Sequence, residues 1–397
     1  MKNIAIVKWT LEISGGGDRQ ALELAYQLQK KGYNVDVFAL NIDKKNCYPD
    51  LIKKLSTYSV PKQKQTEILE LSKYSLPLKL FYFIPNIFRK RKNLLALKDV
   101  IKQQDKKKQY DVINYHEGEV PTIAQYFKEK KNVWMLNDLF IEGNNAIETI
   151  ALKFDNVVTA LYFNRFIDTI VVLDNQNKKI IKKHLYSYAT VIRSGLDQNK
   201  FYKKRLYKAK KQLSILATGI FFPHRRYEDL IEGMHIAIHK MNIKDIKLNI
   251  IGQAKTNQEY FNKIVSLIQK YNLKNNIRLL GGVSEKELIS QYQKADIFVF
   301  PNSPQTWGLA VFEAMIAGCV AIVSKGAGAH EVLTNNKDAL LVDPKSPEQI
   351  AKAIKKIAKD TKFRKKIATN GQDFVKESIS WERYASQMIE IFKNKTN

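Results

Sequence analysis

Short apolar runs alternate with longer amphipathic segments from one end of the chain to the other. The apolar runs are rich in Val, Ile and Leu, which is typical of strands covered on both faces. The segments between them, such as Gly17–Lys31 and Asn257–Tyr271, place apolar residues at helical spacing. Strands that alternate with helices predict parallel sheets in an α/β protein.

The predicted strands fall into two sets. Those of the first half are Asn3–Val7, Asn34–Leu40, Asp111–His116, Asn132–Leu136, Thr169–Asp174 and Ala189–Arg193. Those of the second half are Ser214–Gly219, Lys247–Gly252, Ile277–Gly282, Asp296–Phe300, Cys319–Ser324 and Ala339–Val342. Two sets of about six strands predict two doubly wound, Rossmann-like domains rather than one.

A charged stretch without a strand pattern separates the two sets. Residues 199–212 read NKFYKKRLYKAKKQ, and a clear strand opens after them. We therefore predict a first domain over residues 1–198, a linker over 199–212 and a second domain over 213–378. The remaining residues, 379–397, include an amphipathic helix that either caps the second domain or crosses back to the first.

The balance of charge points to an anionic partner. The 397 residues carry a formal net charge of +27 at pH 7. This excess favours phosphorylated substrates, an anionic membrane surface or nucleic acid, unless it only reflects a chain rich in Lys, Ile and Asn throughout. We see no basic recognition helix and no RNA-binding aromatic motif, so we expect no nucleic-acid partner.

Cysteine usage and hydropathy indicate a cytoplasmic protein. Cys47 and Cys319 are the only cysteines, which excludes a disulfide scaffold and a zinc cluster and suits a reducing compartment. The first apolar run is too short for a signal peptide, and no run of 18 apolar residues spans a bilayer. We expect any membrane contact to be peripheral, at the inner face of the cell membrane.

One segment of the first domain suits such a contact. Leu78–Lys92 reads LKLFYFIPNIFRKRK, with aromatic residues and isoleucines beside four consecutive basic residues. The pattern fits an interfacial membrane segment, and it fits equally a core-facing helix followed by a solvated basic turn.

The segment Pro301–Met315, PNSPQTWGLAVFEAM, carries the clearest candidate chemistry. It joins a predicted strand, a turn at Gly308 and an apolar helix that begins at Leu309. The free N–H groups of a helix N-terminus bind phosphate, and the helix dipole favours negative charge there. Glu313 lies one turn further along the same helix face, where it could take a ligand hydroxyl beside the phosphate.

Glycine turns follow other strands of the same domain. The run that starts at Gly219 ends in Arg225 and Arg226, which together could clamp a diphosphate. The first domain has a comparable loop, in which its first strand leads through Gly16 and Gly17 into a helix. This loop lacks the G-x-G-x-x-G spacing of the dinucleotide fingerprint. Taken together, the turns predict a nucleotide-sized site along one edge of the second sheet.

At these residues the chain resembles glycosyltransferase family 4, the glycosyl transferases group 1. The resemblance runs from about Val191 to Leu341. It rests on VIRSGLDQNKF, ATGIFFPHRRYEDLI, IRLLGGVSEKEL, ADIFVFPNSPQTWGLAVFEAMIAG and SKGAGAHEVL, in this order and spacing. The resemblance implies a GT-B fold, with two Rossmann-like domains facing across a cleft. It also implies a retaining transferase that uses a nucleoside-diphosphate sugar as co-substrate.

The resemblance gives several residues of the second domain a role in binding the donor. Glu313 matches the second glutamate of the family motif, which holds the ribose hydroxyls, whereas the first position is Gln305 here. Arg225 matches a lysine on the diphosphate, but Ile220 stands where an arginine is usual, so Arg226 is the candidate to replace it. The residues that match backbone contacts to the base, the sugar and the phosphates are Val283, Trp307, Gly308 and Leu309, and we add Gly219 as a candidate donor-binding residue from its turn.

In the first domain, Gly16 and Gly17 match the loop near the phosphates and the acceptor. The family often has a histidine after the fourth strand of this domain, where this chain has Asn137. His116, after the third strand, is the nearest alternative. We therefore name Gln305, His116 and Asn137 as the candidate catalytic residues. A structural role for His116 remains equally open.

The resulting hypothesis is a metal-independent hexosyltransferase that needs no cofactor beyond its nucleotide-sugar donor. The basic first domain would meet a glycan or lipid-linked acceptor of cell-envelope or polysaccharide biosynthesis. Two alternatives remain open. The departures at Gln305, Ile220 and Asn137 fit a non-catalytic GT-B partner subunit, and a GT-B sugar-nucleotide epimerase would share the donor site.

Overall fold

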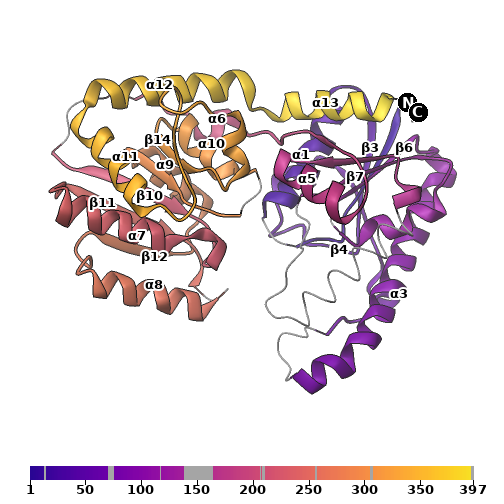
Figure 1. Ribbon diagram of the computed structural model, residues 1–397. Helices are drawn as coiled ribbons and strands as arrows, with labels where there is room; N and C mark the ends of the chain where they lie inside the picture. The colour runs from indigo at the N-terminus through magenta and orange to yellow at the C-terminus, as the bar shows by residue number, and fades with distance from the viewer. Residues whose placement is uncertain are drawn as a thin grey trace. The chain divides into compact units, whose positions relative to one another are not determined.

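The structure, a computed structural model, describes residues 1–12, 15–69, 76–116, 118–137, 164–205, 207, 211–254, 257–304 and 307–394, with side chains outside 76–84. Its contacts divide the chain into two compact units (Figure 1). The first unit comprises Met1–Arg193 and Tyr384–Asn397, and the second comprises Ser194–Arg383. The first unit therefore includes the end of the chain.

The first unit is built on a seven-stranded parallel sheet. Its strand order is β5-β3-β1-β6-β7-β8-β9. These strands are β1 (Asn3–Val7), β3 (Asn34–Ala39), β5 (Ser56–Ser59), β6 (Val112–His116), β7 (Lys131–Met135), β8 (Thr169–Val172) and β9 (Ala189–Val191), and a separate pair is formed by β2 (Thr10–Leu11) and β4 (Asn41–Ile42). The chain winds outward from β1 in one direction and returns through β6 in the other. Such a switch point is where open α/β sheets bind ligands.

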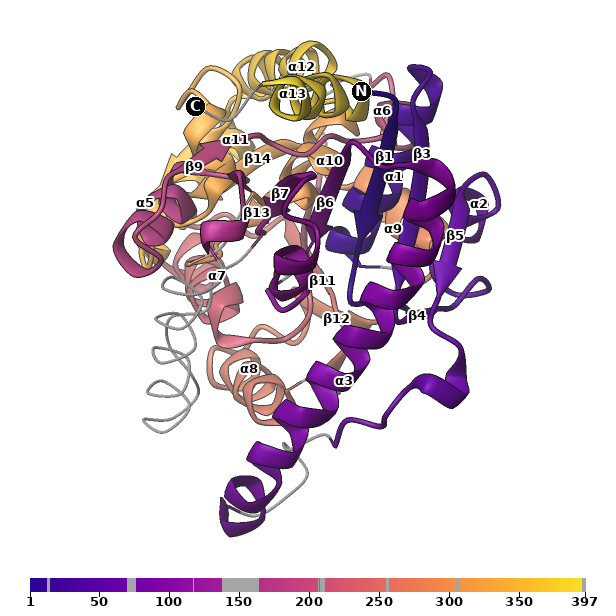
Figure 2. The ribbon, with the colours of Figure 1, turned by 90° about the vertical axis from the view of Figure 1, so that its right-hand side faces the viewer.

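Helices surround the sheet of the first unit. They are α1 (Gly16–Lys30), α2 (Pro49–Ile52), α3 (Leu76–Lys108), α5 (Asn175–His184) and α13 (Trp381–Lys393), with short 3-10 helices η1 (Lys62–Lys64), η3 (Val120–Tyr126) and η5 (Asn164–Phe166). Side chains from α3, η3 and α5 form one hydrophobic core with those of the strands. In Figure 2, the amino-terminal part of α3 extends well beyond the sheet of this unit.

The second unit is built on a six-stranded parallel sheet. Its order is β12-β11-β10-β13-β14-β15. The strands are β10 (Leu213–Thr218), β11 (Ile246–Ile251), β12 (Ile277–Gly281), β13 (Ile297–Phe300), β14 (Val320–Ser324) and β15 (Leu340–Val342). Here the switch point lies between β10 and β13, which pair with Ile215 opposite Ile297.

The helices of the second unit follow the strands in alternation. They are α6 (Gln198–Phe201), α7 (Tyr227–His235), α8 (Gln258–Lys270), α9 (Glu285–Lys294), α10 (Leu309–Ile316), α11 (Pro347–Lys359) and α12 (Thr361–Ser378), with η6 (Pro223–Arg225), η9 (Gly328–Val332) and the π-helical turn η7 (Ile236–Lys240). Apolar side chains of α7, α8 and α11 pack with those of the strands into one core. Both units thus have the doubly wound parallel architecture that the sequence predicts.

Every predicted strand is present, with bounds that differ by a few residues at most. The division into units falls between Arg193 and Ser194, a few residues before the predicted boundary at 198. The part of the C-terminal helix from Tyr384 to Lys393 groups with the first unit, and its first turn groups with the second. Tyr384 and Met388 of this helix are fully buried, which accounts for its amphipathic sequence.

Candidate functional site

The loops that follow β10 and β13 flank the switch point of the second sheet. Both contain residues that the sequence predicts to bind a donor. The backbone N–H of Ser303, after β13, donates to the carbonyl oxygen of His224, after β10, over 2.8 Å. This hydrogen bond ties the two loops together at the carboxyl edge of the sheet.

Neighbouring loops approach this pair so closely that only glycine fits. A Cβ on Gly252, after β11, would lie 2.0 Å from the carbonyl oxygen of Gly219. A Cβ on Gly326, after β14, would lie 2.4 Å from the Oγ of Ser303. Four consecutive strands of the sheet therefore end in loops that contact one another. The glycine turns that the sequence singles out form one continuous edge.

Gly219 and Arg225 form the best-defined part of this edge. Gly219 has a φ of +142°, and a Cβ there would lie 3.0 Å from the guanidinium Cζ of Arg225. The hydroxyl of Tyr227 donates to the Gly219 carbonyl oxygen over 2.9 Å, which fixes the turn. Ile220 is 39% exposed at the position where the related family has a cation. The cationic group that the fold brings to this turn is therefore Arg225.

His224 is neutral at physiological pH. Burial first, and then the charge of Arg225, lowers the pKa of its imidazole to about 4. In this loop Arg225 is therefore charged, and its neighbour His224 adds no positive charge.

Arg226 points to a different set of partners. It adopts a left-handed backbone with φ +52°, which turns its side chain onto the start of α7. There its guanidinium pairs with Asp229 over 2.7 Å and with Glu228 over 3.1 Å. The prediction that Arg226 joins Arg225 as a diphosphate clamp stays a prediction, and this pairing does not favour it.

The N-terminus of α10 has the form expected of an anion site. Gly308 precedes it with φ +78° and ψ +63°, and no side chain of the described residues caps the first turn. Leu309 begins the helix. Gln305, the candidate that departs from the family motif, lies outside the described residues.

Trp307 plays a part that its sequence position does not reveal. Its indole is 1% exposed, and its Nε1–H donates to the carbonyl oxygen of Ser194 over 3.0 Å. Its ring packs on Phe312 with centroids 4.5 Å apart. The side chain is thus part of the core of the second unit, so any contact of Trp307 with a ligand would come from its backbone.

Glu313 is held by a buried tyrosine. The hydroxyl of Tyr292, on α9, donates to Oε2 of Glu313 over 3.0 Å. The same hydroxyl lies 3.1 Å from Oγ1 of Thr218, the last residue of β10. Val283, the predicted contact to the base, follows β12 and is half-buried. Among the described residues, the predicted donor-binding positions of the second unit thus follow the carboxyl ends of its strands.

The first unit gathers polar residues at its own switch point. β1 pairs with β6 so that Val7 lies opposite Tyr115, which places Lys8 and His116 next to each other at the strand ends. Gly16 begins α1, and a Cβ on Gly17 would lie 3.4 Å from Nδ2 of Asn137 and 3.7 Å from Nζ of Lys8. The structure therefore brings the predicted residues of the first domain together and adds Lys8, which sequence reasoning missed.

The hydrogen bonds of His116 define its tautomer. Nδ2 of Asn114 donates to the carbonyl oxygen of Val133 over 3.1 Å, so its Oδ1 is the acceptor that faces the imidazole. His116 Nε2 lies 2.9 Å from that oxygen and must carry the proton. Nδ1 therefore keeps its lone pair, is buried, and has no partner among the described residues.

Electrostatics keep His116 neutral. Burial, and then the charge of Lys8, lowers the pKa of this imidazole to about 3. At neutral pH the side chain can accept a hydrogen bond at Nδ1, but it has no proton there to give. This geometry suits contact with a ligand hydroxyl better than general acid catalysis.

Lys8 is itself buried and ion-paired. Its side chain is 1% exposed and pairs with Asp18 in the first turn of α1. Cys47 donates its thiol hydrogen to Asp18 over 3.8 Å, and burial followed by the nearby Asp18 carboxylate raises the pKa of that thiol to about 12. The thiol is therefore not a nucleophile at neutral pH.

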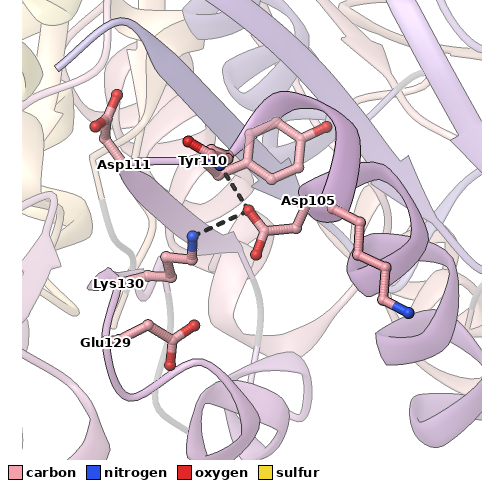
Figure 3. A pocket seen from close by; sticks show the side chains of 7 residues that line it. Asp105, Tyr110, Asp111, Glu129 and Lys130 are labelled. Carbon is pink, nitrogen blue, oxygen red and sulfur yellow. Dashed lines mark hydrogen bonds and ion pairs between the residues drawn. The ribbon is translucent and has the colours of Figure 1, made fainter.

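A separate hollow lies at the opposite edge of the first sheet. It has a volume of about 490 Å³ and is lined by Asp105 on α3, by Asp111 just before β6, and by Glu129 and Lys130 just before β7 (Figure 3). Asp105 pairs with Lys130 over 3.1 Å. Its carboxylates make it a poor host for a diphosphate. Over the described part of the chain, no group of three His, Cys, Asp or Glu residues is placed to hold a metal ion.

Known proteins resemble both the second unit and the chain as a whole. Residues 198–374, within the second unit, match the family model of glycosyl transferases group 1. The mannosylfructose-phosphate synthase of Agrobacterium fabrum is 20% identical over 416 residues, which covers 96% of this chain and 87% of that protein. An uncharacterized glycosyltransferase of Methanocaldococcus jannaschii is 28% identical over 179 residues, or 45% of this chain and 44% of that protein.

The fold of the whole chain also has solved counterparts. The crystal structure of Anabaena Alr3699/HepE in complex with UDP has a TM-score of 0.75 to this chain at 15% identity. The match covers 98% of this chain and 99% of that chain. At this identity the likeness establishes the shared two-domain architecture.

Proposed function

We propose that this chain, a glycosyltransferase of GT-B fold that resembles glycosyltransferase family 4, moves a hexose from a nucleoside-diphosphate sugar to a hydroxyl acceptor with retention. The observation that carries the proposal is the edge of the second sheet. There Arg225 lies against the Gly219 turn, no side chain of the described residues caps the start of α10, and Glu313 follows one turn along. These features suit a diphosphate and a ribose side by side.

The chemistry requires the leaving diphosphate to be neutralised. The positive charge of Arg225 and the N–H groups at the start of α10 supply donors where negative charge develops as the sugar departs. This arrangement is the basis for proposing a metal-independent reaction. An oxygen of the donor's own phosphate would take the proton of the acceptor hydroxyl, as is proposed for the related family.

Residues at the switch point of the first unit could by themselves contact the hydroxyl groups of a sugar. The lone pair at His116 Nδ1 accepts from a hydroxyl, and the side-chain oxygen of Asn137 is a second buried acceptor. Gln305 would also bind a hydroxyl, but as a neutral amide it cannot stabilise a cationic sugar as a carboxylate would. We therefore assign these three residues to sugar positioning rather than to proton transfer.

The acceptor is proposed to be a glycan or lipid-linked glycan of cell-envelope or polysaccharide biosynthesis. None of the helices in the described part of the chain is long and apolar enough to cross a membrane. On α3, Ile87 is 49% exposed and Phe88 is 65% exposed, and the exposed Arg91 and Lys92 follow one turn later. Exposed apolar and basic side chains on one helix suit peripheral contact with an anionic membrane at its cytoplasmic face.

The experiment that tests the proposal measures donor hydrolysis and nucleotide binding by the full-length chain. UDP is the first nucleotide to try, because the solved counterpart binds it. A transferase of this kind releases the nucleoside diphosphate slowly when no acceptor is present. Binding without release, with or without glycan acceptors, would instead support the non-catalytic partner subunit that the exposed Ile220 and the amide at Gln305 favour.

A further inference from the structure

Glu313, on α10, accepts a hydrogen bond from Tyr292, a residue on α9. The Tyr292 side chain is 1% exposed, and burial followed by the charge of Glu313 raises its pKa well above the ordinary value. The phenol is therefore protonated at neutral pH. A phenol has one proton to donate, and here it goes to Oε2 of Glu313 over 3.0 Å.

This donation fixes the direction of the hydrogen-bond chain. Because the phenol proton is used on Glu313, the contact of 3.1 Å between Tyr292 and Thr218 needs the threonine hydroxyl as donor. The order is therefore Thr218 to Tyr292 to Glu313. Thr218 directly precedes Gly219, the glycine against which Arg225 lies. One chain of hydrogen bonds thus connects the proposed diphosphate turn with the proposed ribose contact.

The surroundings of Tyr292 hold its hydroxyl at this point. Its ring contacts those of Phe201 and Phe298, with centroid distances of 5.9 Å and 5.7 Å. Its carbonyl oxygen, near the end of α9, accepts from a guanidinium nitrogen of Arg205 over 2.7 Å and faces the thiol of Cys319 at 3.2 Å. These contacts fix both the ring and the backbone of Tyr292. A side chain that positions another, as Tyr292 would position Glu313, has to be fixed in this way.

We propose that Tyr292 is a positioning residue for the donor site: it holds the Glu313 carboxylate for the ribose hydroxyls and, through Thr218, couples ribose contact to the diphosphate turn. The inference rests on the proposed function, because it assumes a nucleoside diphosphate at this edge. It goes further by naming a residue that touches no substrate. It also predicts that recognition of the ribose hydroxyls depends on a phenol in the core.

The test compares UDP with its 2′,3′-dideoxy form, which lacks the hydroxyls that Glu313 would bind. Dissociation constants are measured for the wild-type chain, Tyr292→Phe, Glu313→Gln and the double variant. We expect Tyr292→Phe to bind UDP on the order of tenfold more weakly, the loss of about one hydrogen bond to a charged group. Its affinity for the dideoxy form should hardly change. The double variant should bind UDP no more weakly than Glu313→Gln alone.

Two further variants separate positioning from loss of structure. Tyr115→Phe removes an equally buried hydroxyl, bonded to Asn132 over 2.9 Å in the first unit, and should leave both affinities unchanged. Thr218→Val removes the first donor of the same series of hydrogen bonds. It should reduce the preference for UDP over the dideoxy form less than Tyr292→Phe does. If Tyr292→Phe does not fold, the two affinities of Thr218→Val still test the proposal.

Each outcome has a distinct meaning. The role of Tyr292 would be overturned if Tyr292→Phe still preferred UDP over the dideoxy form as strongly as the wild-type chain does. It would also be overturned if the losses of UDP affinity in the double variant were additive. Either result would leave the proposed function intact. Equal weakening of both ligands would show a merely structural role and would also overturn it. If the wild-type chain binds neither UDP nor any other nucleoside diphosphate, the proposed function fails and the inference falls with it.

Discussion

Arg225 and Gly219 are in contact across the turn that follows β10. A Cβ on Gly219 would lie 3.0 Å from both Cζ and Nε of the Arg225 guanidinium. Glycine is favoured at this position by its φ of +142°, and an added Cβ would also crowd the arginine side chain. The turn and the cation form one structural feature, and changing either should disturb the other.

The variant Gly219→Ala tests this contact. The added methyl group displaces the Arg225 side chain, so we expect nucleoside-diphosphate affinity to fall on the order of tenfold or more, with a loss of stability of about 1 kcal/mol or more from the backbone. Gly32→Ala is the matched control, because Gly32 also has a positive φ, +84°, but an added Cβ meets nothing within 4 Å. Isothermal titration with UDP and thermal denaturation measure the two effects. Unchanged affinity in Gly219→Ala would refute the contact's role.

Arg226 offers a sharp contrast to its neighbour. Because its guanidinium is paired with Glu228 and Asp229, Arg226→Ala should lower the melting temperature by a few degrees and leave nucleotide affinity nearly unchanged. Arg225→Ala should show the reverse pattern. Equal loss of affinity in both variants would instead support the diphosphate clamp of two arginines that the sequence predicts.

His116 should make stability depend on pH. The unfolded chain binds a proton at this imidazole near pH 6.5, whereas the folded chain does so only near pH 3, because burial and Lys8 lower the pKa. Acidification from pH 7 to pH 5 therefore favours the unfolded state, by about 2 kcal/mol from this group alone. The variant His116→Gln should lose that much less stability over the same interval in urea titrations. Identical pH slopes for the two proteins would contradict a neutral, buried His116.

The sequence predicts the parallel sheets well because their strands are covered on both faces and read as continuous apolar runs. The strand β5 escapes this pattern. Its sequence, Ser56–Ser59, is polar, and it pairs only with β3 at the edge of the sheet, where its side chains are half-buried or exposed. The glycine turns can be predicted for the same reason, because each of them directly follows an apolar run that is recognisable as a strand.

The parts of the site that the sequence does not predict depend on contacts between distant elements. The hydrogen bond of Tyr292 to Glu313 needs the packing of α9 against α10, and neither residue signals it alone. The pairing of Lys8 with Asp18 beside His116 depends on the register of β1 and β6. Arg226 looks like a partner of Arg225 in sequence, and only its left-handed backbone redirects it.

The proposed membrane contact predicts a specific salt dependence. The full-length chain should sediment with anionic vesicles at low ionic strength and release progressively as salt screens the lysines and arginines. Replacing Ile87 and Phe88 together by Ser should weaken binding at every salt concentration, because both side chains are exposed and apolar. Replacing the exposed Tyr186 and Tyr188 by Ser is the matched control. Absence of binding to anionic vesicles at low salt would exclude the contact.

The most direct test of the central claim is thermal stabilisation of the full-length chain by a panel of UDP-, GDP- and dTDP-sugars. A ligand that binds only the folded state at 100 times its dissociation constant adds about 2.7 kcal/mol to stability. We predict that at least one of these sugars raises the melting temperature of the wild-type chain, and that Glu313→Ala and Arg225→Ala each remove most of the shift. If no nucleotide sugar shifts the wild-type protein, or if both variants respond fully, the second sheet edge is not the donor site.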